Sequence, residues 1–187
     1  MKFDHNNFLV RPRSWESIDQ DAMIMRETYD LQDVTFMPVI ELLEHVLCNE
    51  LNEISLELVE DGEAQGFEGC TALDGKTIYL RNSVYIGAYK DQARHRFTVA
   101  HELGHAVLHA GQTPTMAFLS NHPDKPFCQS EPQANRFAAS LLVPLKLLKP
   151  TDDELAVSSR FGVSKSTARI RLKEYREKIL GESKFQF

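Results

Sequence analysis

The chain has 187 residues, a formal net charge of −6 and 42% hydrophobic residues, enough for one substantial core with a small appended module. No apolar run reaches the roughly 18 residues of a membrane span, and the polar start lacks a signal peptide's apolar stretch. We therefore expect a cytoplasmic protein without membrane partners. Its three cysteines are an odd number without close pairing, which favours reduced thiols over a disulfide framework.

The first half of the chain predicts two helices followed by strands. Ser14 suits the start of a helix to about Tyr29, and Pro38 begins a second helix with an apolar face formed by Val39, Leu42, Leu43, Val46 and Leu47. Residues 54–58 alternate as a strand does, and segments 67–72 and 76–81 flank an Asp-Gly hairpin signal. These features predict a small, mainly antiparallel sheet. Its strand 76–80 is either an ordinary strand or an exposed edge that pairs with an extended substrate.

A helix predicted from about Gln92 to His109 carries the run His101-Glu102-Leu103-Gly104-His105. Histidines four residues apart lie one turn apart, so both imidazoles can bind one metal ion. Glu102 can reach the open coordination position and accept a proton from water there. This is the pattern of HExxH zinc peptidases. Gly104 costs about 1 kcal/mol relative to alanine inside a helix, which we expect close packing of a strand against it to offset.

A third metal ligand has to come from elsewhere in the chain. His109 lies about 12 Å along a straight helix from His101, too far to share an ion with both motif histidines. We therefore expect it to be a neighbour of the site or a helix C-terminal residue. Cys128 is a further candidate, although a loop thiol without a metal role is the favoured interpretation. The better candidate is Glu131.

Glu131 begins a second predicted helix of about three turns. Ser130 and Gln133 form a capping-box pattern, and Val143-Pro144 marks the end of the helix. The buried stripe is expected to consist of Ala134, Phe137, Ala138, Leu141 and Leu142. Glu131 projects from the N-terminal end of this stripe, where a buried carboxylate needs a charged partner or a metal. Asn135, one turn later, is a candidate to accept the free N–H of a liganding histidine.

These segments together resemble the ImmA/IrrE family of HExxH zinc metallopeptidases. The resemblance rests on residues 96–105, 131–138 and 141–144, and extends to 14–16, 74–78, 84–85 and 161–164. It implies that His101, His105 and Glu131 bind one Zn²⁺ and that Glu102 is the general base. It further implies a bacterial or phage regulatory protease that cleaves helix-turn-helix repressors. Val143 stands where members of the family often have methionine, a packing change outside the chemistry.

Other parts of the predicted site stay open. Tyr79, Tyr85, Tyr89 and His109 are all eligible to stabilise the oxyanion or contact substrate, and the sequence does not choose among them. The segment 111–129 contains three prolines and is predicted to be a loop bordering a cleft.

The C-terminal segment predicts a helix-turn-helix. A helix begins at residues 152–154, residues 161–163 make a turn, and Ser164 caps a second helix. Residues 160–178 contain seven basic and two acidic side chains, which would suit phosphate contacts by Arg160, Lys165, Arg169, Arg171 and Lys173. Because the whole chain is acidic, we do not expect DNA binding and favour a substrate-docking or core-completing module.

The sequence therefore predicts an α+β fold in which the small sheet packs on the HExxH helix and on a second ligand-bearing helix. We expect residues 1–150 to form a zinc metallopeptidase-like domain and residues 151–187 a helix-turn-helix-like module. The predicted function is a zinc endopeptidase acting on a protein substrate, a helix-turn-helix repressor or a related regulatory partner. The alternative is a zinc-binding regulator that acts through DNA or protein binding without proteolysis.

Overall fold

Helices dominate the computed structural model, which describes residues 8–64, 66–112, 125–179 and 181. The expected α+β class is confirmed. The α-helices are α1 (Trp15–Thr28), α2 (Val39–Glu41), α3 (Asn82–Tyr89), α4 (Ala93–His109), α5 (Ser130–Leu142), α6 (Glu154–Phe161) and α7 (Lys165–Lys178). The strands are β1 (Ser55–Val59), β2 (Gly69–Thr71) and β3 (Thr77–Arg81). Single 3₁₀ turns cover Pro126–Cys128 and Leu145–Leu147.

Side-chain caps fix the ends of three helices where the sequence predicts them. Ser14 accepts a hydrogen bond from the Ser17 amide before α1, and Ser164 accepts one from the Thr167 amide before α7. Asp153 caps α6 in the same way. Each cap satisfies an amide that has no partner inside the helix. Gly162 then ends α6 with φ of 63°, a left-handed conformation that glycine adopts without steric cost.

Two helical segments differ from the expectation. The helix expected at Pro38 is α-helical only over α2 and continues as a π-helix, η1, over Leu42–Glu50. Helix α3, which carries Tyr85 and Tyr89, was not predicted. Its residues are mostly small or apolar, so no clean helical period marks it.

The sheet has the strand order β1-β3-β2. The Asp-Gly hairpin is confirmed: β2 and β3 are antiparallel, and Gly75 in their turn has φ of 73°. Strand β1 pairs with β3 in parallel, because the chain crosses over between them. Of the two alternatives for residues 76–80, the structure shows the ordinary strand, since β3 is paired on both sides and is not an exposed edge. The edge strand beside α4 is β2.

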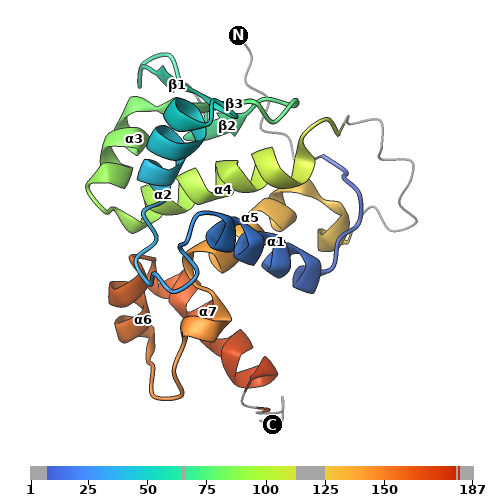
Figure 1. Ribbon diagram of the computed structural model, residues 1–187, viewed down its shortest axis with the longest axis vertical. Helices are drawn as coiled ribbons and strands as arrows, with labels where there is room; N and C mark the ends of the chain where they lie inside the picture. Colours follow the sequence, from blue (N-terminus) through green and yellow to red (C-terminus); the bar gives the residue numbers. More distant parts are fainter. Residues whose placement is uncertain (1–7, 65, 113–124, 180, 182–187) are drawn as a thin grey trace.

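Helix α4 runs through the centre of the molecule, with the sheet and α3 on one side and α5 and α1 on the other (Figure 1). Gly104 allows the close approach of α5. A Cβ at this position would lie 3.1 Å from the carbonyl oxygen of Ala134 and 3.2 Å from the Cβ of Phe137. The glycine therefore makes room for the second ligand-bearing helix, and the expectation of a strand packed there is wrong.

Helices α6 and α7 contribute to the same core as the rest of the chain, through Val157, Phe161, Ala168 and Leu172 among others. Buried arginines join them to the central helices. Arg96 of α4 donates to the carbonyl of Gly162 at 3.2 Å, and Arg171 of α7 donates to that of Val143 at 2.9 Å. The proposed division at residue 150 stays a prediction. Within the described residues, every helix is too short or too polar for a bilayer crossing.

Candidate metal centre and cleft

Helix α4 presents His101 and His105 one turn apart, with their Nε2 atoms 3.0 Å from each other. Helix α5 begins opposite them and contributes Glu131. Its Oε2 lies 3.2 Å from Nε2 of His101, and its Oε1 lies 3.1 Å from Nε2 of His105. The ligand atoms of these three side chains all lie within 4.8 Å of one another. Among the described histidines, cysteines and acids, they are the group that converges in this way.

The cap expected for α5 is absent. Ser130 is the first helical residue rather than the cap, and its hydroxyl accepts a hydrogen bond from the Phe8 amide at 3.1 Å. The Gln133 side chain does not cap the helix but donates to the carbonyl oxygens of Arg11 and Phe127. The capping-box prediction is therefore wrong, because segments distant in sequence compete for both side chains. The predicted end of the helix at Val143 and its buried stripe are confirmed.

The electrostatics of the three side chains favour a cation between them. Burial would raise the pKa of Glu131, but hydrogen bonds from both histidines hold it well below its usual range. Burial would lower the pKa of His101, but the carboxylates of Glu131 and Glu102 raise it. A positive charge at this point is therefore stabilised. Two imidazole nitrogens and one carboxylate are a donor set that suits a catalytic divalent ion such as zinc.

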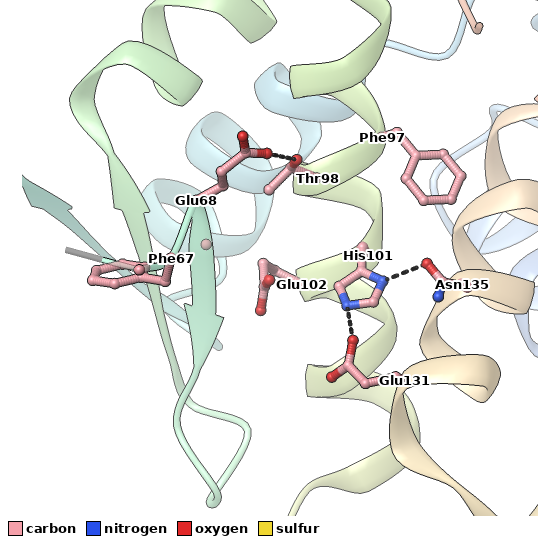
Figure 2. A pocket seen from close by; sticks show the side chains of 10 residues that line it. Phe67, Glu68, Phe97, Thr98, His101, Glu102, Glu131 and Asn135 are labelled. Atoms are coloured by element: carbon pink, nitrogen blue, oxygen red, sulfur yellow. Dashed lines mark hydrogen bonds and ion pairs between the residues drawn. The ribbon is translucent and has the colours of Figure 1, made fainter. Parts of the chain in front are cut away.

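The outer nitrogen of His101 also has a partner. Its Nδ1 lies 3.1 Å from Oδ1 of Asn135. Figure 2 draws this contact as a dashed line. An amide oxygen can only accept, so Nδ1 carries the hydrogen and Nε2 offers its lone pair to a metal. The structure thus brings Asn135 to the place predicted for it, one turn after Glu131.

Glu102 projects from α4 on the side that faces β2, and only 4% of it is exposed. The hydroxyl of Thr71 lies 2.8 Å from its carboxylate Oε2 and 3.0 Å from its carbonyl oxygen. Gly69 leaves room for the same side chain, since a Cβ there would lie 2.8 Å from Cγ of Glu102. Sequence reasoning missed Thr71 and Gly69. Only the small residues in segment 67–72 hint at such a close approach.

A cavity of about 310 Å³ opens beside these groups. Its lining includes His101, Glu102, Glu131 and Asn135, and also the apolar residues Phe67 and Phe97 (Figure 2). The cavity therefore joins the candidate ligands and the candidate base to a surface that can hold an apolar group.

The model of the peptidase M78 family, described as an IrrE N-terminal-like domain, matches residues 70–173. The chain belongs to this family. The family is zinc-dependent, and the fold is zinc metallopeptidase-like. A Mycobacterium tuberculosis transcriptional regulator has a similar structure, with a TM-score of 0.57 and 16% identity over 84% of this chain. The match covers 46% of that regulator, so the chain spans about half its length. No curated protein matches the sequence significantly.

The other predicted contact residues of this IrrE-like chain lie outside the cavity lining. The Tyr85 hydroxyl donates to Glu44 of η1 at 2.9 Å, and the Tyr89 hydroxyl also contacts Glu44. Burial and the Glu44 carboxylate raise the pKa of Tyr85. Tyr79 lies on the central strand β3. The structure therefore does not bring these tyrosines together with the metal ligands, and their role stays a prediction.

Two other candidate residues, His109 and Cys128, are not among the three converging metal ligands. His109 is buried behind His105, with the two Nδ1 atoms 3.0 Å apart. Burial, together with the neighbouring His105, lowers the pKa of His109 to about 4, so its ring is neutral. Cys128 is buried and lies outside the converging group. Most of the predicted cleft loop, residues 113–124, falls outside the described part of the chain.

Three of the five basic residues considered for phosphate contacts already have partners inside the protein. Arg160 donates to Asp152 at 3.0 Å and Arg169 to Glu154 at 2.9 Å. Arg171 is 1% exposed and donates to Glu174 at 2.6 Å. Lys165 and Lys173 are exposed. The two-helix module of this IrrE-like chain therefore presents less free positive charge than its sequence indicates.

Proposed function

We propose that the chain is a zinc-dependent endopeptidase. The observation that carries this proposal is the convergence of His101, His105 and Glu131 beside an almost fully buried Glu102 and an adjacent cavity. Membership of a peptidase family implies a protein substrate. We further propose that this substrate is a helix-turn-helix repressor or a related regulatory partner, as the family resemblance implies.

His101, His105 and Glu131 would hold the ion. Zinc bound there would supply Lewis-acid chemistry, polarising the scissile carbonyl and making the attacking water more acidic. Glu102 then accepts the proton of that water at its carboxylate and delivers it to the nitrogen of the leaving amine. Its Oε2 is held by the Thr71 hydroxyl, so that the carboxylate is oriented before the substrate arrives.

Strand β2 would present the substrate. The amide of Arg81 donates to Glu68 and the amide of Ala72 donates to Thr77, so alternate residues of the β2 segment bond to β3. The backbone groups of Gly69 and Thr71 therefore face the other edge. An extended peptide paired along this edge would pass beside Glu102. Because Phe67 and Phe97 are among the residues that line the cavity, we expect it to favour an apolar side chain of the substrate.

The decisive experiment uses a Glu102→Gln variant and a purified repressor encoded next to the gene for this chain. We expect the variant to keep its zinc and to cleave the repressor at least about 100-fold more slowly, since the amide keeps the size but removes the base. Glu57→Gln, at an exposed position on β1, is the matched control and should cleave normally. Near-normal cleavage by Glu102→Gln would assign the base to another residue.

The same variant distinguishes proteolysis from the regulatory alternative. A zinc-binding regulator would retain its biological effect in the Glu102→Gln form, because binding of DNA or protein does not require a general base. An endopeptidase would lose it. For DNA binding itself, charge reversal belongs at Lys165 and Lys173, because reversal at Arg171 would disrupt buried contacts.

A further inference from the structure

A continuous chain of side-chain hydrogen bonds extends from the far side of His105 into the protein. Nδ1 of His105 lies 3.0 Å from Nδ1 of His109, and Nε2 of His109 lies 3.2 Å from Oε1 of Gln133. The Gln133 amide nitrogen lies 2.9 Å from the Arg11 carbonyl oxygen and 2.7 Å from that of Phe127. His109 is 4% exposed and Gln133 is fully buried, so water does not substitute for these bonds.

The partners allow only one arrangement of hydrogens. Two carbonyl oxygens contact one end of the Gln133 amide, so that end must be the NH₂ group and the other end must be the acceptor. His109 therefore carries its hydrogen on Nε2 and leaves Nδ1 free to accept. His105 in turn must carry its hydrogen on Nδ1. Its Nε2, the atom that faces Glu131 and His101, is left with a lone pair, which is the state a metal ligand requires.

The last acceptors in this series of hydrogen bonds, the carbonyl oxygens of Arg11 and Phe127, belong to segments that hydrogen-bond to each other. The extended N-terminal segment, residues 8–13, lies against residues 127–130. Val10 donates to the Cys128 carbonyl at 2.9 Å, and Arg13 donates to the Phe127 carbonyl at 3.0 Å. The Phe8 ring packs edge-on against His109, with centroids 6.0 Å apart. The series of hydrogen bonds therefore ends on backbone carbonyls of the N-terminal segment and of the 3₁₀ turn Pro126–Cys128, which hydrogen-bond to each other, rather than on side chains.

We propose that His109 and Gln133 are positioning residues that hold His105 in its metal-binding tautomer and orientation. This inference rests on the proposed function, since it requires that His101, His105 and Glu131 bind the ion. His109 is not a ligand in this arrangement. Its loss should leave the capacity at one zinc per chain but weaken the affinity, because the His105 ring is then free to rotate and change tautomer.

The test measures the dissociation constant for zinc by competition with a chromophoric chelator. His109→Leu removes the acceptor at similar volume, whereas His109→Asn keeps an acceptor near the position of Nδ1. We expect the leucine variant to bind zinc about 10- to 100-fold more weakly, and the asparagine variant to recover much of that loss. Gln133→Met, which leaves His109 in place, should also weaken binding. Leu108→Val is the control, being buried on the same helix without a polar side chain.

Folding of each metal-free variant is checked by circular dichroism. Unchanged zinc affinity in a folded His109→Leu would overturn the inference, as would equal losses in the leucine and asparagine variants. If the leucine variant does not fold, Gln133→Met decides in its place, and wild-type affinity there refutes the inference. A wild-type protein that binds no zinc would instead refute the proposed function, so the two failures are distinguishable.

Discussion

Replacement of Gly104 by alanine tests whether the contact between α4 and α5 sets the geometry of the metal centre. Helix propensity alone predicts a gain of about 1 kcal/mol in the free energy of unfolding. The added methyl would, however, lie 3.1 to 3.2 Å from the Ala134 backbone and the Cβ of Phe137. These atoms cannot rotate away, so the helices must separate by a few tenths of an ångström. Overpacking of this kind costs about 1–3 kcal/mol, which leaves a net loss of up to about 2 kcal/mol.

The same separation would move Glu131 away from His101 and His105, because α5 carries one ligand and α4 the other two. Metal–ligand distances tolerate only about 0.2 Å, so we expect zinc to bind more weakly as well as the fold to be less stable. Urea unfolding of the metal-free protein and chelator competition measure the two effects. Gly62→Ala is the control, since a Cβ there meets nothing within 4 Å. A Gly104→Ala protein that is about 1 kcal/mol more stable, with unchanged zinc affinity, would refute the reasoning.

Three further predictions concern single side chains. Glu131→Ala should lose most of its zinc on dialysis against a chelator, and full retention would rule out Glu131 as a ligand. Thr71→Val should lower kcat about tenfold, equivalent to about 1.4 kcal/mol, because it removes the hydroxyl that contacts the Glu102 carboxylate. Zinc content and KM should stay unchanged, and Thr71→Ser should recover the activity. An unchanged kcat would contradict the positioning of Glu102 by Thr71. Asp19→Asn should destabilise the fold by about 3 kcal/mol at pH 7, measured by urea unfolding, because Asp19 pairs with Arg136 at 2.7 Å. Burial would raise the pKa of Asp19, but hydrogen bonds from Arg136 and Ser140 lower it below the ordinary 3.8. The stabilisation that the Asp19 carboxylate gives to the fold is therefore complete above pH 3.8 and should disappear as the pH falls through the lowered pKa.

Local signals made much of the fold predictable from the sequence. The caps at Ser14 and Ser164 and the left-handed Gly162 act within one helical turn, so their residue types are sufficient evidence. The spacing of His101 and His105 is equally local, since the α-helix itself brings them to one face. Glu131 could be predicted because its position at the end of an apolar stripe leaves a carboxylate facing the core.

Features that depend on distant segments were not predictable in the same way. The parallel pairing of β1 with β3 is set by a crossover that leaves no mark in either strand. Gln133 fits a capping box by its spacing, yet its amide is used by His109, Arg11 and Phe127. Thr71 contacts Glu102 across 31 positions of sequence. Such partners are chosen by packing in three dimensions, which a single sequence does not reveal.

Contacts made by Arg96 and Arg136 limit where this chain can be divided. A cut after residue 150 would remove the Gly162 carbonyl that Arg96 contacts and the Glu174 carboxylate that Arg136 contacts. Arg96 would keep the Met37 carbonyl and Arg136 would keep Asp19, so each guanidinium would lose one of its partners. A hydrogen bond to a charged group contributes about 1.5–3 kcal/mol, so these losses would destabilise the shortened chain. We therefore expect that helices α6 and α7 can replace those of a relative only if the partners of Arg96 and Arg136 are kept.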